Sequence, residues 1–175
     1  MSFSPYTVNG HIFLGAGIDY APEGKWKLSG LYGRFLKAVE PDTTTENAAL
    51  PSFQRMGYGF KASYGEGGNF FDLILFRAKD DINSISYVPD SLGVLPQENL
   101  VLSLGGGKTF FQHFVLKGEF ATSAITRDTR AERSDQNHVL ANAGFLYTPR
   151  ASSSFYNAFK TSFDFQQDIY SIGVG

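Results

Sequence analysis

Three histidines are the residues of this chain best suited to acid–base chemistry: His11, His113 and His138. A serine paired with one of them, such as Ser134 or Ser123 with His138, would suit a lipid-cleaving enzyme built at the rim of a barrel. The chain has no G-x-S-x-G motif, no H-E-x-x-H motif and no cysteine. We therefore expect that the protein is not an enzyme and that its histidines are polar residues at the bases of loops.

Two short motifs resemble ligand-binding loops without completing them. The stretch GGGKT at 105–109 ends like a phosphate-binding loop, but the first glycine of that motif would fall at Leu102. FFQHF follows as a strand pattern, so we expect turn glycines there. DDINS at 80–84 could offer Asp81 and Asn83 to calcium, yet it lacks the glycine and the distal glutamate of the calcium-binding loop. The sequence predicts no metal site and no cofactor.

The composition points to a single all-β domain over residues 1–175. Glycine occurs 19 times and phenylalanine 17 times, whereas charged residues make up only 18% of the chain. A net charge of −2 argues against a nucleic-acid partner, which would favour a basic surface. No apolar stretch is long enough for a membrane-spanning helix, and MSFSPYTVNG at the start does not read as a signal peptide.

Alternation with a period of two defines the expected strands. Between residues 56 and 64, large side chains such as Tyr58 and Phe60 alternate with Gly57, Gly59 and Lys61. The same pattern predicts about eight strands, near 12–20, 26–33, 56–64, 71–75, 99–105, 114–120, 139–147 and 159–165. Tight turns are expected near 21–25, 65–69, 106–111 and 148–153, and long connections near 38–55, 78–98 and 124–136.

Strands of about ten residues, joined by tight turns at one end and long polar loops at the other, are typical of transmembrane β-barrels. We therefore expect an antiparallel up-and-down transmembrane barrel of about eight strands, or a segment of a larger one, with membrane lipid as its partner. The predicted lipid-facing residues are Leu14, Tyr58, Phe60, Leu73, Leu102, Leu116, Phe145 and Phe163. The predicted lumen-facing polar residues are Asp19, Lys27, Lys61, Asp72, Lys117, Glu119, Lys160 and Asp164.

A second interpretation remains open, because periodicity alone does not say which face meets water. In a soluble, lipocalin-like barrel the apolar face would bind an apolar ligand inside. Its interior would then be lined by Leu102, Leu104, Phe60 and Phe120.

Part of the chain resembles the large outer-membrane β-barrel proteins of Bacteroidetes-type bacteria. The resemblance covers about residues 57–128, including FDLILFRAKDDINSI at 71–85 and PQENLVLSLGGGKTFFQHFVLKGEFATSAITRD at 96–128. A weaker similarity is found in FQQDIYSIG near the end. It implies only a location, the Gram-negative outer membrane, and a barrel architecture. Protein partners in an outer-membrane assembly are a separate expectation. Proteins of this group are much longer, so we expect this chain to be a piece of a bigger barrel. The expected function is that of a porin-like pore wall, a translocation element for transport or a membrane scaffold.

Overall fold

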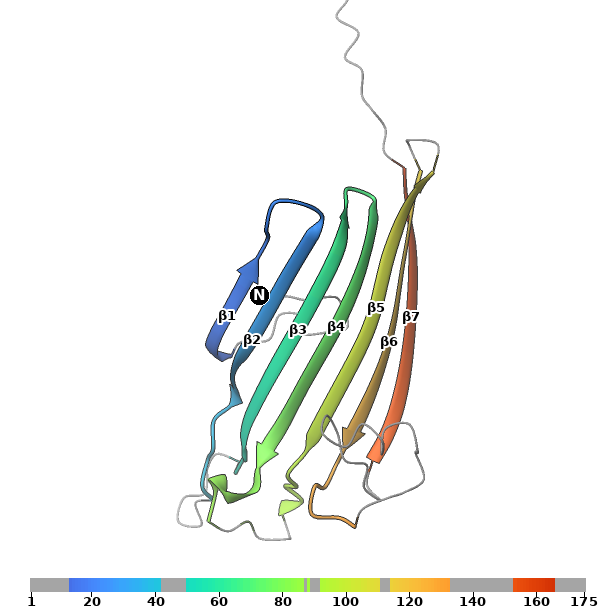
Figure 1. Ribbon diagram of the computed structural model, residues 1–175. Coiled ribbons are helices and arrows are strands. Elements are labelled where there is room, and N and C mark those ends of the chain that lie inside the picture. Colours follow the sequence, from blue (N-terminus) through green and yellow to red (C-terminus); the bar gives the residue numbers. More distant parts are fainter. Residues whose placement is uncertain are drawn as a thin grey trace, which may run out of the picture.

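The computed structural model describes residues 13–41, 50–86, 88, 92–110, 114–132 and 153–165. These residues form one antiparallel sheet whose strands follow each other in chain order (Figure 1). The seven strands are β1 (Leu14–Tyr20), β2 (Trp26–Leu36), β3 (Gln54–Glu66), β4 (Asn69–Asp81), β5 (Glu98–Phe110), β6 (Phe114–Thr126) and β7 (Ser153–Phe165). A 3-10 turn, η1 (Ile82–Ser84), follows β4. The predicted all-β up-and-down topology is confirmed for these residues.

The predicted turns can be compared with the observed connections. Residues 21–25 join β1 to β2, and Gly67 and Gly68 form a two-residue turn between β3 and β4, both as predicted. Gly67 adopts a φ of 58°, a left-handed conformation that glycine enters without steric cost. The strand predicted at 139–147 and most of the turn predicted at 148–153 lie outside the described residues.

The expectation of a turn at Gly105, Gly106 and Gly107 was wrong. All three residues belong to β5, which continues as a strand to Phe110. The physical reason is visible at Gly107, where a Cβ atom would collide with the ring of Phe70 on the neighbouring strand. Glycine is needed here because an aromatic ring lies across the backbone, as it often does over strand glycines.

Tight turns and long connections lie at opposite ends of the sheet (Figure 1). At the long-connection end, the β2–β3 and β4–β5 connections are tied together. Val39 and Ser52 form an isolated backbone bridge, and the carboxylate of Glu40 accepts hydrogen bonds from the Ser86 amide at 3.0 and 3.1 Å. The Ser84 hydroxyl accepts a bond of 2.8 Å from the Gln54 amide. The described parts of these loops are therefore held to one another and to the strands.

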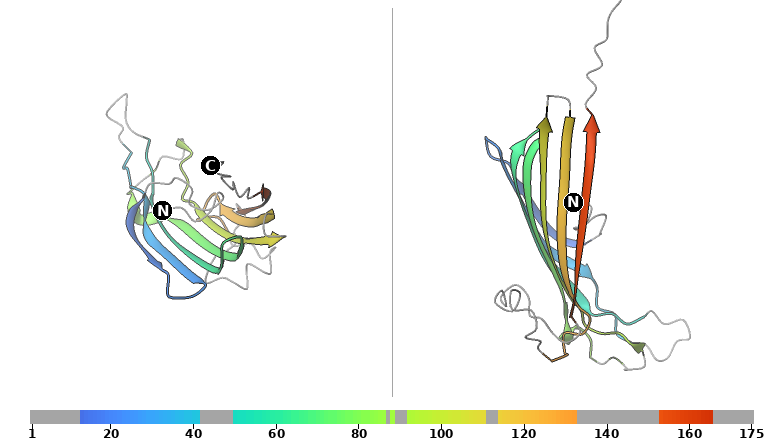
Figure 2. Two further views of the ribbon diagram at one scale, coloured as in Figure 1. Left: turned by 90° about the horizontal axis from the view of Figure 1, so that it is seen from above. Right: turned by 90° about the vertical axis from the view of Figure 1, so that its right-hand side faces the viewer.

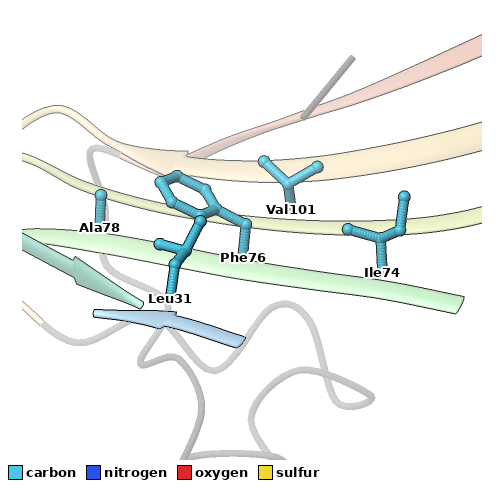
Figure 3. Close-up of a cluster of buried hydrophobic side chains, with 5 residues drawn as sticks. All are labelled: Leu31, Ile74, Phe76, Ala78 and Val101. Atoms are coloured by element: carbon cyan, nitrogen blue, oxygen red, sulfur yellow. The ribbon is translucent and has the colours of Figure 1, made fainter. Parts of the chain in front are cut away.

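The sheet is curved, and β1 and β7 do not pair with each other within the described residues (Figure 2). One face carries a cluster of buried apolar side chains, which all rise from the same side of the sheet (Figure 3): Leu31, Ile74, Phe76, Ala78 and Val101. We call this the inner face and the opposite one the outer face. Within the described residues, no helix is long and apolar enough to cross a membrane.

Candidate functional site

The strand register brings the predicted polar residues together on the inner face. Lys27, Asp72 and Glu119 fall in one row across the sheet, with Ser63 and Gly105 between them. The next row along the strands contains Asp19, Lys61 and Ile74, and Lys117 lies two residues before Glu119 on the same side of β6. In β7, the backbone of Lys160 pairs with Glu119 and that of Asp164 pairs with Val115. Charges of both signs are thus placed side by side.

Specific contacts join several of these side chains. The Lys61 ammonium lies 3.2 Å from an oxygen of Asp72, and both side chains are largely buried. On the neighbouring pair of strands, the hydroxyl of Ser103 donates a 2.7 Å hydrogen bond to the Glu119 carboxylate. A partly buried charge is tolerated when an opposite charge or a hydrogen-bond donor satisfies it. The inner face can therefore hold ionised groups.

The residues predicted to face lipid share the outer face as far as they are described. Four of these residues are exposed, with exposed fractions from 37% for Leu73 to 69% for Leu14 and with Phe60 and Leu102 between them. Tyr58 and Leu116 on the same face are half-buried. The backbone of Phe163 pairs with that of Leu116, whereas Phe145 lies outside the described residues.

Charged residues are absent from the middle of the outer face in the described strands and appear only toward its margins. On β5, the outer-face charges are Glu98 and Lys108, and the positions between them are Leu100, Leu102, Leu104 and Gly106. At about 3.4 Å per residue, this interval measures about 34 Å along the strand. A strand tilted by about 40° would span about 26 Å across a bilayer, close to the apolar band of about 25 Å in outer-membrane barrels. On β5 the uncharged interval therefore matches the length of that band, whereas on β4 Arg77, the register partner of Leu100, brings a charge one row closer to the middle.

Aromatic residues mark one margin of this apolar band. Trp26, Tyr64 and Phe71 are neighbours in one row across β2, β3 and β4, near the tight turns. The rings of Trp26 and Tyr64 lie 4.9 Å apart in a tilted arrangement. Toward the long-connection end, Tyr32 and Tyr58 occupy a second row. Amphipathic aromatic rings are enriched where a barrel wall passes from hydrocarbon to headgroups.

The apolar cluster on the inner face was missed by the sequence reasoning. Besides its five buried members, the rings of Phe13 and Phe35 stack 5.1 Å apart, and Phe35 meets Phe76 edge-on at 5.4 Å. The prediction of a lumen lined by glycine and polar side chains is therefore incomplete, because the inner face also carries this apolar cluster. The sequence did indicate this cluster: from Leu73 to Phe76, the residues on both faces of the strand are apolar.

Two ion pairs at the long-connection end were also missed. Arg55 holds Asp80 with two hydrogen bonds of 2.7 and 2.9 Å, and the Gln97 amide donates a third of 2.9 Å to the same carboxylate. On the outer face, Arg77 donates a 2.8 Å bond to Glu98. Asp80 and Glu98 are almost fully buried. These pairs anchor the β4–β5 connection to the ends of its strands.

The residues considered for catalysis and metal binding are not assembled into a site in the described structure. His11, His113, His138 and Ser134 lie outside the described residues, and Ser123 stands on the inner face of β6. Asp81 accepts a 3.0 Å hydrogen bond from the Asn83 amide and so caps η1. Among the described side chains, no group of three or more His, Cys, Asp or Glu could hold a metal ion.

Comparison with known proteins adds nothing to this geometry: no protein-family model, no curated protein and no solved structure matches the chain.

Proposed function

We propose that this protein forms part of the wall of a transmembrane β-barrel in the outer membrane of a Gram-negative bacterium. In that position it acts as a porin-like pore wall, a translocation element or a membrane scaffold, without catalytic activity of its own. The observation that carries the proposal is that charged side chains of both signs lie on the inner face and are missing from the middle of the described outer face. Asp19, Lys27, Lys61, Asp72 and Glu119 share the inner face, while the middle of the described outer face carries no charge.

The exposed apolar surface supports the same conclusion. Large apolar side chains that are exposed on the outer face include Leu14, Ile18, Tyr20, Trp26, Tyr32, Phe60, Tyr64, Phe71, Leu73, Leu102, Leu104 and Phe120. Each of β1 to β6 contributes at least one of them. Soluble monomers rarely expose a continuous apolar patch of more than a few hundred Å², because such a surface drives association in water. Hydrocarbon chains would satisfy this surface, as lipid does for the outer wall of a membrane barrel.

The soluble alternative has one observation in its favour, the buried apolar cluster around Phe76 on the inner face. A lipocalin-like barrel would use such a cluster to bind an apolar ligand. However, that interpretation places Leu102, Leu104, Phe60 and Phe120 inside, and all four are exposed on the outer face. It also leaves the ion pair of Lys61 and Asp72 on the same inner face as the ligand. The membrane interpretation accounts for the exposed outer face and for the ion pair on the inner face.

Trp26 provides a direct test, because it is the only tryptophan in the chain. Its side chain is exposed on the outer face in the aromatic row near the tight turns. In liposomes, we expect lipids brominated near the headgroup to quench Trp26 fluorescence at least twofold more than matched unbrominated lipids. Iodide in the aqueous phase should quench it only weakly.

Ser63, on the inner face beside Lys27, gives the matched control. In the variant Trp26→Phe with Ser63→Trp, the indole should respond to the brominated lipids less than Trp26 does and to iodide more. Strong iodide quenching of Trp26 together with no effect of the brominated lipids would refute the membrane assignment.

A further inference from the structure

The sheet has two edges that the described pairings leave open. Within the described residues, β1 pairs with β2 alone and β7 with β6 alone. In a bilayer, each unpaired backbone amide or carbonyl costs several kcal/mol, so an open edge is not stable there. The proposed barrel must therefore pair both edges.

The strand directions exclude the simplest closure, in which β1 pairs with β7. Because every pairing is antiparallel and the strands follow in chain order, β1, β3, β5 and β7 all run toward the tight-turn end (Figure 2). A ladder between β1 and β7 would therefore be parallel. Bacterial single-chain outer-membrane barrels are built from an even number of antiparallel strands, so this closure does not fit the proposed barrel.

A second copy of the sheet does not close the barrel either. If two copies enter the membrane with the same orientation, β7 of one again meets β1 of the other in parallel. An antiparallel contact of β1 with a second β1 requires one copy to be inverted. The inverted copy would place its long connections at the opposite membrane surface, which vectorial insertion of identical chains does not allow.

The free edge of β1 is well suited to accept another strand. Its sequence, LGAGIDY, contains no proline and no lysine, and its register with β2 is unbroken from Leu14 to Tyr20. Soluble proteins protect an edge strand with lysine, proline or a bulge. In the described sheet, the one register shift is in the pairing of β2 with β3, between Arg34 and Leu36 of β2, so it does not protect the edge of β1.

We infer that an odd number of further strands of the same polypeptide fills the seam between β7 and β1. The strands next to β1 and β7 run from the tight-turn end to the long-connection end, with apolar residues outward and polar residues inward. We assign them to the same chain by analogy with β1, β3 and β5, each of which reaches the tight-turn end and is followed in the chain by a neighbour running back. The inference rests on the proposed barrel function.

Nuclear Overhauser contacts between backbone amide protons test the seam in the whole protein in detergent micelles. We expect β1 and β7 each to show antiparallel cross-strand contacts to residues of the same chain outside β1–β7. Contacts of β1 with β7, or no contact of β1 beyond β2, would overturn the inference. A mixed sample of labelled and unlabelled protein identifies intermolecular contacts, and finding the seam contacts there would overturn it as well.

Disulfide trapping gives a second, independent measurement, because the chain has no cysteine of its own. The pair Asp19→Cys and Ser29→Cys joins register partners of β1 and β2 and should oxidise readily. Asp19→Cys combined with a cysteine at position 158, 160 or 162 of β7 should not, since even one intervening strand separates the backbones by about 10 Å, beyond the reach of a disulfide. Oxidation of a β1–β7 pair as complete as in the control would contradict the inference.

The two proposals fail in different ways. Seam contacts without quenching of Trp26 by brominated lipid would leave a closed barrel that is not a membrane protein. Quenching of Trp26 without seam contacts would leave a membrane-bound sheet that is closed in another way.

Discussion

Leu102 and Gly105 lie on the same strand but on opposite faces of the sheet. Leu102 is on the outer face in the middle of the uncharged interval of β5. Gly105 is on the inner face, where its register partners are Asp72 on one side and Glu119 on the other. A Cβ atom added to Gly105 would meet its nearest neighbours at ordinary contact distances. A positively charged side chain should therefore destabilise the protein at position 102 and be tolerated at position 105.

We expect Leu102→Lys to reduce the free energy of folding into lipid by about 2–4 kcal/mol, the range measured for charges at the bilayer midplane. Gly105→Lys should cost less than about 1 kcal/mol, because the new ammonium lies between two carboxylates. Urea titrations of both variants in liposomes, followed by Trp26 fluorescence, measure the difference. Equal losses in the two variants would argue against the assignment of the faces. Ser103 is unsuitable as the inner control, because it is fully buried and bonded to Glu119.

At the scale of the strands, the alternation of large with small or polar side chains made the sheet predictable from the sequence. It did not predict the contacts between neighbouring strands. The outer-face positions of Phe60 and Leu102 follow from a period of two, which is visible in the sequence alone. The glycines at 105–107 were misread, since a run of glycine is equally compatible with a turn and with a strand crossed by an aromatic ring. The contact of Arg55 with Asp80 could not be foreseen, because it depends on the register of β3 against β4.

The packing of Phe70 over Gly107 predicts a sharp difference between two adjacent glycines. Gly107→Ala should destabilise the protein by about 1–3 kcal/mol, because the added methyl group overpacks the contact between β4 and β5. Gly106→Ala is the matched control, since its Cβ would meet only the carbonyl oxygen of Phe70, at 3.4 Å. Its effect should stay within about 0.5 kcal/mol. Urea midpoints measure both, and recovery of the Gly107→Ala loss in combination with Phe70→Leu would identify the ring as the cause.

At the scale of the whole molecule, the described strands form a single layer, with charges and an apolar cluster on the inner face and an uncharged apolar middle on the outer face. Such a layer has no second sheet to cover its outer face within the described residues. The apolar band around Phe60 must therefore meet lipid, detergent or another protein.

Removal of detergent should therefore make the wild-type protein aggregate. We expect a defined particle in micelles and large, polydisperse assemblies in plain buffer, measured by size-exclusion chromatography with light scattering. Return of detergent should recover at least part of the defined particle. A wild type that remains monomeric in plain buffer would end the outer-membrane hypothesis and favour the soluble barrel.

If the protein is the membrane barrel proposed above, the contacts among the long connections affect how it enters a bilayer. The contacts of Glu40 with Ser86, of Gln54 with Ser84 and of Arg55 with Asp80 concentrate polar groups at one end of the sheet. Carrying that end through hydrocarbon would cost several kcal/mol for each group left without a partner. The β3–β4 turn at the other end is only Gly67 and Gly68. Insertion should thus proceed with the short turns leading, and this asymmetry alone would fix which end of the barrel faces the cell.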